Sequence, residues 1–400
     1  MRLCGILLLS AVCPAMRADT AAVLPFVNRT AAADPGQASM DWIGESIAET
    51  VRDAIGSRGG VTWSRQDVDE AYRTLSLRKL APLTEASIWK LGQALDAEQV
   101  VYGTIEFAAD PTAVHGVGEG SLKISARIFD RRRFKQSSEF TESGNLEDLA
   151  TLEAHLAWRT LMIVAPKLAP READFRSLRP TVRLDAEENY VRGLLAHAPE
   201  QRERYLLQAA RLDTRFGHPH FELGKLHYER KEYRQAAEWL QKVMPEDFHY
   251  RDANFLLGVA LFQSGDFAGA QKAFQVVADA VPLSEVFNNL GAAESRRNLP
   301  QALEAFRKAL DGDPNDPVYH FNVGYALWKK GDYMAAADRF RAVLDRQPED
   351  EFATLMLGMC LKKQPARPPD PRVEMLERLK LNFEERAYLQ LKALVSPGQP

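Results

Sequence analysis

The second half of this chain repeats at a fixed interval of 33 or 34 residues, and no other feature constrains its fold as strongly. A glycine that follows leucine or valine marks each clear copy, and the steps between these copies are 34, 33, 33 and 34 residues. The marking glycines are Gly224, Gly258, Gly291, Gly324 and Gly358, with a weaker copy at Gly193. A period of this length indicates a solenoid, in which one small unit is stacked many times. The second half is therefore predicted to be a stack of similar units.

A second set of residues recurs behind each glycine. In the copy "KGDYMAAADRF", Ala336, Phe340, Val343 and Pro348 lie four, three and five residues apart, and the two preceding copies have the same spacing. Residues at i, i+4 and i+7 share one helical face, where the aromatic ring fills the space left by small neighbours. The proline then ends the helix. A glycine inside a helix costs about 1 kcal/mol relative to alanine, so its recurrence indicates that two helices approach closely.

These spacings resemble the tetratricopeptide repeat family, whose unit is a helix, a tight turn and an antiparallel helix. Complete units are predicted at 217–250, 251–283, 284–316 and 317–350, with a degenerate unit at 185–216 and a first helix at 351–363. Gly331 is expected to end the first helix of its unit, and Asp332 is expected to cap the second. The predicted solenoid spans 185–366, and we expect capping helices and a tail within 367–400.

An array of this kind curves so that its first helices line a concave groove. The residues that the family's phasing turns toward the groove are mainly aromatic, with basic residues at the edge. They are Phe221, Tyr228, Phe255, Phe262, Asn288, Arg296, Phe321, Tyr325, Trp328 and Lys329. Aromatic side chains bury a large area at a small cost in rotamer entropy, so the groove suits an extended or helical peptide with apolar residues. Phe321, Tyr325 and Trp328 are the predicted anchors.

The first half has the pattern of a mixed sheet covered by helices. Apolar runs such as "AAVLPFVN" alternate with helical segments, and "SLKISARIFD" alternates apolar and polar residues as an antiparallel strand does. The predicted order is β-α-β-α-α-β-β-β-α over 19–167, followed by a linker at 168–184. The fold class predicted for the whole chain is therefore multidomain: an N-terminal α/β domain with a mixed sheet, then an all-α superhelix of tetratricopeptide repeats.

Several phrases of the first half resemble a known family. "VLPFVN", "WIGESIAETV", "LGQALDAEQVVYGTI" and "ISARIFD" are similar to the amino-terminal domain of TolB and to the curli-assembly (CsgG-like) outer-membrane lipoproteins. The resemblance implies a noncatalytic domain that serves envelope assembly and protein contacts. This chain lacks the membrane-inserting hairpin and the propeller of those proteins, so neither pore formation nor the role of TolB is implied.

Residues 1–18 read as a secretory signal peptide, in which Arg2 precedes an apolar stretch and small residues follow Pro14. The predicted location is the periplasm or the exterior. Two alternatives stay open: Cys13 is a candidate for lipidation, which would anchor the chain to a membrane, and translation from Met16 would leave it in the cytosol. No later segment approaches the ~20 apolar residues of a membrane span. Cleavage would leave one cysteine and therefore no intramolecular disulfide.

Composition and motifs disfavour nucleic acid, metal and catalysis. A chain with a net charge of −4 has no bulk attraction to nucleic acid. The glycines of "HGVGEG" join two predicted strands, whereas a phosphate loop joins a strand to a helix. His218, His220 and His227 do not converge as metal ligands do, because the last two are two helical turns apart. No nucleophile or carboxylate motif appears, so we predict neither a cofactor nor an enzymatic activity.

Together these features predict a noncatalytic protein-protein interaction scaffold of the bacterial cell envelope. Its concave groove is expected to capture apolar or aromatic peptide segments. The alternative is an envelope protein whose first domain binds a small ligand or a carbohydrate, while the repeats mediate oligomerisation. The sequence names neither the partner nor the oligomeric state.

Overall fold

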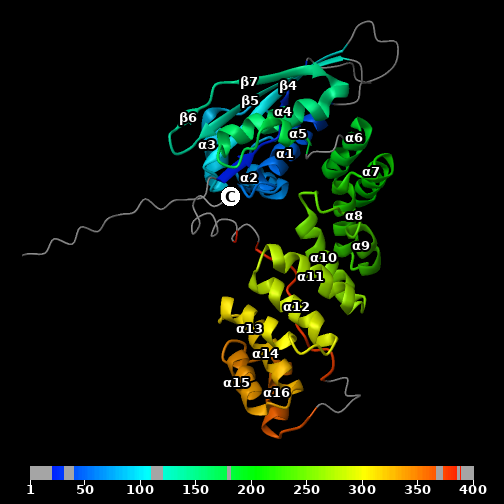
Figure 1. Cartoon of the computed structure of the whole chain (residues 1–400). Coiled ribbons are helices and arrows are strands. Elements are labelled where there is room, and N and C mark those ends of the chain that lie inside the picture. The colour runs from blue at the N-terminus through cyan, green and yellow to red at the C-terminus, as the bar shows by residue number, and fades with distance from the viewer. Residues whose placement is uncertain are drawn as a thin grey trace, which may run out of the picture.

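The computed structural model describes residues 20–30, 40–109, 120–177, 182–365, 373–384 and 388. An α/β domain forms one end of the molecule, and a column of paired helices extends from it (Figure 1). A mixed sheet near the N-terminus and a mostly helical remainder agree with the predicted fold class. Residues 1–18 lie outside the described residues, and so do Cys13, Gly116 and Gly118. Within the described part, no helix has the length and apolar composition needed to cross a membrane.

The sheet combines parallel and antiparallel pairs. Its strands are β1 (Thr20–Val23), β2 (Val27–Asn28), β3 (Val61–Thr62), β4 (Gln99–Ala109), β5 (Gly120–Asp130), β6 (Lys135–Gln136) and β7 (Phe140–Asn145). The order is β3-β1-β4-β5-β6, with β2 also on β4 and β7 also on β5. Strand β1 is parallel to β3 and β4, whereas β4 and β5 form a long antiparallel hairpin. The strands before and after residues 110–119 are thus paired with each other, as predicted for the strands on either side of "HGVGEG".

Helices cover both faces of the sheet. They are α1 (Asp41–Gly56), α2 (Arg65–Thr74), α3 (Glu85–Ala94) and α4 (Leu149–Val164), with the 3-10 helix η1 (Leu146–Asp148) before α4. Alternate residues of β5, including Ile124 and Ile128, are buried in the core with α1 and α4. Val100 and Phe129 point to the other face, where they join the core with α2 and α3. The period-2 pattern of the strands thus supplies apolar residues to two layers.

Eleven helices among the described residues follow the short helix α5 (Glu172–Ser177) of the predicted linker. They are α6 (Leu184–Leu195), α7 (Pro199–Leu212), α8 (Gly217–Glu229), α9 (Tyr233–Leu240), α10 (Tyr250–Gln263), α11 (Phe267–Ala280), α12 (Ser284–Arg296), α13 (Ala302–Gly312), α14 (Pro317–Lys329), α15 (Tyr333–Leu344) and α16 (Glu351–Leu361). Helices α6 to α15 form successive pairs, and α16 packs on α15 as the first helix of a further unit.

The recurring glycines stand where paired helices touch. A Cβ atom at Gly291 would lie 2.8 Å from a ring carbon of Phe306, and a Cβ at Gly258 would lie 2.6 Å from a ring carbon of Phe274. Both distances are too short for carbon atoms, so the predicted close approach is confirmed at these units. Gly358 has open space around its Cβ position, because α16 is the last helix that the structure describes in the array.

In two of the units, the turn between the paired helices uses a glycine and an aspartate. Gly331 adopts φ +83°, and the next residue, Asp332, caps α15 by accepting a hydrogen bond from the Ala335 N–H at 3.3 Å. Gly265 and Asp266 have the same roles two units earlier. A left-handed glycine followed by a capping acid turns the chain between two antiparallel helices. The predicted roles of Gly331 and Asp332 are confirmed.

The first helix pair of the array packs directly on the α/β domain. Leu206 and Val191 of this pair belong to the same buried apolar cluster as Ile47 of α1 and Leu156 of α4. A continuous core therefore joins the two parts of the chain.

The C-terminal region differs from the prediction. The sequence predicts capping helices within 367–400, but residues 373–384 contain no helix. The backbone groups of Arg378 and Lys380 bond to asparagine side chains of the array, and a helix would need those groups for its own hydrogen bonds. The surface on which this segment lies therefore decides its conformation. The rest of the predicted cap, apart from residue 388, lies outside the described residues.

Candidate functional site

Residues 373–384, which we call the C-terminal segment, lie along the first helices of the repeat units. In Figure 1 the red segment runs back from α16 toward α10, opposite to the direction of the array. Its first residue, Val373, accepts a hydrogen bond from Tyr325 of α14 at 2.7 Å. Near its other end, the Phe383 ring lies 4.7 Å from the Phe255 ring of α10. The surface predicted as a peptide groove is thus covered by a segment of the same chain.

Two asparagine side chains hold the backbone of the C-terminal segment. Asn322 accepts from the Arg378 N–H at 2.9 Å and donates to the Arg378 carbonyl at 2.8 Å. Asn289 makes the same two bonds with Lys380, at 2.8 and 2.7 Å. Each amide uses its donor and its acceptor on a single residue, as a neighbouring strand does in a hydrogen-bonded pair. Because the two clamped residues are two apart, the segment is held extended.

Asn288 connects the two clamps. Its Nδ2 donates to the Arg378 carbonyl at 2.8 Å, and its Oδ1 accepts from Asn322 at 2.7 Å. Nδ2 also lies 3.2 Å from Oδ1 of Asn289. All three asparagines have 0% exposure, so their amides depend on partners inside the protein. An extended backbone in the groove completes this network.

The carboxylate of Glu377 enters a basic pocket between α12 and α14. Ser295 Oγ donates to it at 2.7 Å, Arg296 Nε lies 2.7 Å from its second oxygen, and Lys329 Nζ lies 3.8 Å away. The Glu377 side chain is only 1% exposed. Burial lowers the pKa of Lys329, the charge of Glu377 raises it, and the charge of Arg296 lowers it again, with a net downward shift. An acid in this pocket offsets part of the positive charge of Arg296 and Lys329.

Basic side chains of the segment pair with acids at helix starts. Arg378 forms two hydrogen bonds with Asp350, at 2.6 and 2.8 Å, and its guanidinium lies 3.5 Å from the centroid of the Phe321 ring. Lys380 forms an ion pair with one carboxylate oxygen of Asp316. Burial raises the pKa of Asp350, but the hydrogen bond from Arg378 leads the effects that bring it below its ordinary value. Both acids also cap their helices, so their positions are fixed before they bind.

The predicted groove residues divide into three groups. Those that contact the C-terminal segment are Phe255, Asn288, Arg296, Phe321, Tyr325 and Lys329. Trp328 is buried and donates to the Gln364 carbonyl at 2.9 Å. Three residues pack against their neighbours in the array: Phe221 on His249, Tyr228 on Tyr233 and Phe262 on Phe267.

Sequence reasoning missed several groove residues, although the repeat carries a signal for them. Asn322 is one repeat after Asn288, and Lys329 is one repeat after Ser295, each by 34 residues. The same step of 34 separates Asp316 from Asp350. Polar residues that recur at one phase of successive units point to a shared surface, and here that surface binds one segment.

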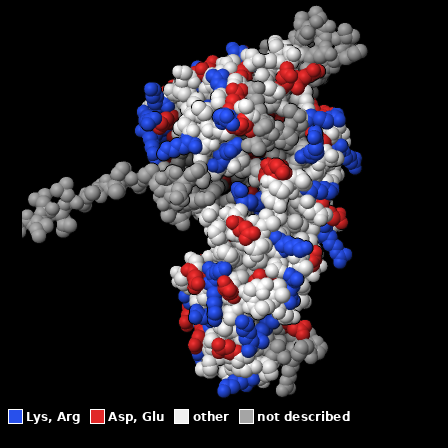
Figure 2. Space-filling view, in the orientation of Figure 1, with Lys and Arg blue, Asp and Glu red and all other residues white. Residues whose placement is uncertain are grey.

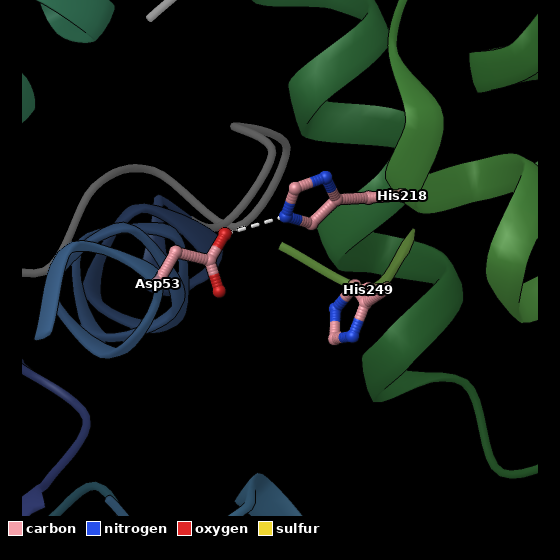
Figure 3. A group of neighbouring side chains, drawn as sticks. All are labelled: Asp53, His218 and His249. Carbon is pink, nitrogen blue, oxygen red and sulfur yellow. Dashed lines mark hydrogen bonds and ion pairs between the residues drawn. The ribbon is translucent and has the colours of Figure 1, made fainter. Parts of the chain in front are cut away.

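A second cluster lies where the α/β domain meets the array. His218 of α8 lies between two carboxylates: its Nε2 is 2.5 Å from Asp53 of α1 (Figure 3), and its Nδ1 is 3.2 Å from Asp247. Burial disfavours the imidazolium, but Asp247 and Asp53 outweigh it, and the pKa of His218 lies well above its ordinary value. Burial raises the pKa of Asp247, whereas the charge of His218 dominates and lowers it. The cluster is a charged ion triplet across the junction.

Two buried carboxyl groups meet at the same junction. Glu153 of α4 accepts from Thr50 at 3.0 Å, and Glu187 of α6 accepts from Ser46 at 2.5 Å. Burial raises the pKa of Glu153 well above its ordinary value, and the charge and hydrogen bond of Glu187 raise it further. Oε1 of Glu153 and Oε2 of Glu187 are buried and have no other donor. The neutral form of Glu153 is therefore favoured at this junction.

The junction contains a set of donor atoms that could hold a metal ion. Atoms of Asp53, His218 and His249 lie within 4.8 Å of one another (Figure 3). The 2.5 Å contact of His218 with Asp53 is a direct hydrogen bond, however, and a metal bound between those two atoms would hold them farther apart. His220 stacks on Trp239 and His227 bonds to Glu232, so these two histidines, which the sequence disfavours as ligands, have separate surroundings.

A cavity of about 430 Å³ adjoins the ion triplet. It is lined by α1, by the start of α2, by helices of the first repeat units and by Leu381 to Phe383 of the C-terminal segment. Charges of both signs lie on its wall, among them Arg52, Lys225 and Asp252. The wall of this cavity therefore combines the domain, the array and the segment.

Lysine and arginine are interspersed with aspartate and glutamate on the face that Figure 2 shows. This distribution agrees with the small net charge of −4 and offers no broad basic surface on that face.

The fold and the groove define a helical repeat protein of the kind that binds other proteins. Two models of the tetratricopeptide repeat match this chain, at residues 252–284 and 321–366, so the chain contains tetratricopeptide repeats.

Solved structures similar to this chain include repeat proteins of the same kind. The "MamA RS-1 ArsTM double mutant" is 24% identical, with 42% of this chain and 94% of that chain covered and a TM-score of 0.37. MamA residues 41 to the end from Desulfovibrio magneticus RS-1 are 25% identical, with coverages of 42% and 95% and a TM-score of 0.37. YrrB, described as a TPR protein with an unusual peptide-binding site, is 15% identical, with coverages of 50% and 96% and a TM-score of 0.40.

Proposed function

We propose that this chain is a noncatalytic protein-protein interaction scaffold whose groove, formed by α10, α12, α14 and α16, binds extended peptide segments. The observation that carries the proposal is the double clamp, in which Asn322 and Asn289 each bond both backbone groups of one residue. Any peptide backbone offers the same N–H and carbonyl groups, so these asparagines suit the binding of an extended peptide segment. Aromatic rings at Phe255 and Phe321 add the apolar contacts that the sequence predicts.

The groove is rigid enough to recognise a peptide without rearranging. Asn322 is bonded to Asn288, and Asp316 and Asp350 are fixed as helix caps. Preformed partners reduce the entropy lost on binding, which favours capture of a flexible segment. Alternate residues of the bound chain meet equivalent residues of successive repeats, so the groove also sets the direction of the peptide.

A peptide-binding experiment tests this function. The full chain with Glu377→Lys and Phe383→Ala should hold its own segment weakly, and a labelled peptide of sequence VEMLERLKLNFE should then bind in trans. Adding Asn289→Ala and Asn322→Ala should reduce binding by about 10- to 100-fold, because four backbone hydrogen bonds are lost. Fluorescence anisotropy measures both affinities. Equal affinity with and without the asparagines would contradict a peptide clamp.

We also propose that the scaffold works in the bacterial envelope after export. The proposal rests on the leader pattern of residues 1–18 and on the resemblance of 19–167 to the TolB amino-terminal and curli-assembly domains. Mass spectrometry of the mature N-terminus from fractionated cells tests it. A chain cleaved near residue 18 supports a periplasmic protein, a lipid on Cys13 supports an anchored one, and an intact cytosolic chain from Met16 contradicts the proposal.

A second candidate function is binding of a small ligand, which the junction cavity favours. Its volume of about 430 Å³ suits a small molecule. Because Phe248 and Arg251 of the array line it together with the domain, the full chain is the right sample, whereas an isolated 19–167 fragment would lack half of the wall. A screen of sugars and small metabolites should raise the melting temperature if this function is real. If no compound raises the melting temperature, the ligand-binding function is contradicted and the scaffold function remains.

A further inference from the structure

The C-terminal segment binds the groove through side chains as well as through its backbone, and these side chains define a pattern. Glu377 enters the basic pocket, Arg378 pairs with Asp350, and Lys380 pairs with Asp316. The remaining anchors are apolar: Leu379 packs on the core of the array, and Phe383 packs on Phe255. The pattern is therefore acidic, basic, apolar, basic, any two residues, aromatic.

The acidic position is the most restrictive part of the pattern. Arg296 and Lys329 face the Glu377 carboxylate, and Ser295 donates to its Oε1. If the segment left, two neighbouring cations would lose the anion that balances them. An acidic residue of another chain would restore the pocket, whereas a neutral residue would leave the two cations without an anion.

The C-terminal segment lies outside the repeat helices. None of the repeat helices described includes it, and exposed apolar side chains remain on it at Met375 and Leu381, with 67% and 61% exposure. It is tied to α16 through residues 366–372, so it competes as an intramolecular ligand at an effective concentration in the millimolar range. A free peptide with the same contacts must overcome this advantage.

We propose that the C-terminal segment is a built-in competitor, and that the groove's partner is a protein segment with the same pattern, Glu-Arg-apolar-Lys-x-x-aromatic. The inference rests on the proposed function, since it requires the groove to bind peptides. The partner displaces the segment and takes over the clamps and the basic pocket. Displacement also removes Leu381 to Phe383 from the wall of the junction cavity, so binding in the groove changes the junction.

The test compares three full-length proteins against one labelled peptide, VEMLERLKLNFE. The proteins are the wild type, the released variant with Glu377→Lys and Phe383→Ala, and a control variant, Met375→Gln, whose substitution lies on the exposed side of the segment. The released variant should bind the peptide on the order of 100-fold more tightly than the wild type, because its own segment no longer competes. Met375→Gln should bind as the wild type does.

Peptide variants test the pattern in the same assay. Replacing the glutamate that corresponds to Glu377 with glutamine should weaken binding to the released variant by about 10-fold or more, because the charge-assisted contacts are lost. Replacing the methionine that corresponds to Met375 with glutamine should have little effect. Equal affinity for the glutamate and glutamine peptides would overturn the proposed partner chemistry.

The outcomes separate this inference from the proposed function. If the wild type and the released variant bind the peptide equally, the C-terminal segment is not a competitor, and the proposal of a peptide-binding scaffold remains. If the released variant keeps its helix content by circular dichroism but binds no peptide, both are wrong. Sedimentation of the wild type gives the remaining outcome: a dimer that the two substitutions abolish would show that the segment occupies the groove of a second copy, which overturns an intramolecular competitor.

Discussion

At the scale of single residues, the groove depends on a few buried amides and charges. The sequence predicted Asn288, Arg296 and Lys329 from the phasing of the repeat, and all three contact the C-terminal segment. It did not predict Asn289, because a neighbouring position in an ideal helix would turn away from the same surface. The bonds that Asn289 makes depend on where the segment lies, which no local pattern contains.

The clamp at Asn322 can be tested by a single substitution. Asn322→Ala leaves the backbone N–H and carbonyl of Arg378 with fewer partners, which should weaken the seating of the segment by about 1–3 kcal/mol. Trypsin should then cut after Arg378 and Lys380 on the order of 10-fold faster or more, as followed by mass spectrometry. Asn315→Ala, at an exposed turn, is the matched control. An unchanged cleavage rate would show that Asn322 does not hold the segment.

At the scale of helices, the period of the sequence determines most of the architecture. The glycine and aromatic positions predicted which helices pair, because Gly258, Gly291 and Gly324 each allow a phenylalanine ring of the second helix to approach. The conformation of the C-terminal segment was not predicted, because it depends on contacts with distant residues and not on a local pattern. Its apolar spacing fits a helix, and the contacts with the array, above all the backbone bonds to asparagines of α12 and α14, make the extended form favourable.

A pair of glycine substitutions tests this account of helix packing. Gly291→Ala places a methyl group 2.8 Å from the Phe306 ring, so we expect a loss of about 1–3 kcal/mol in the free energy of unfolding. Gly358→Ala has open space and should stabilise the last helix by up to about 1 kcal/mol, because alanine has the higher helix propensity. Urea unfolding measures both changes. A shift of stability in the same direction for both variants would show that these glycines are not placed by helix contact.

The junction between the domain and the array depends on protonation. The pKa of His218 and the pKa of Glu153 are both raised in the folded protein. The stability that these two groups contribute to the folded protein is fully present at pH values below their ordinary pKa values, about 6.5 and 4.5. It is lost as the pH rises through their pKa values in the folded protein. The lowered pKa of Asp247 acts in the opposite sense, since its contribution is lost only as the pH falls below its ordinary value of 3.8.

We therefore expect the melting temperature to fall as the pH rises from 6 toward 9. Glu153→Gln should flatten this dependence, because the amide can donate to Glu187 at every pH. Glu147→Gln, at an exposed position of η1, should keep the slope of the wild type. Differential scanning calorimetry at several pH values gives the comparison. A slope unchanged by Glu153→Gln would show that the two carboxyl groups do not share a proton.

At the scale of the whole molecule, the C-terminal segment links parts that are distant in the chain. It begins beside α14, crosses α12 and ends at α10, where Leu381 to Phe383 reach the cavity beside the α/β domain. The sequence predicted the two parts but not their contact, since His218 and Asp53 are 165 residues apart. Such contacts arise from tertiary packing, which residue spacing does not reveal.

The most direct test of the account is hydrogen exchange of the Arg378 and Lys380 backbone amides in the full-length protein. Both N–H groups donate to buried asparagine oxygens, so we predict exchange on the order of 100-fold slower than in the free peptide VEMLERLKLNFE. An excess of that peptide should speed exchange of both amides in the protein. Exchange at the rate of the free peptide in the protein alone would contradict the seated segment, and with it the built-in competitor.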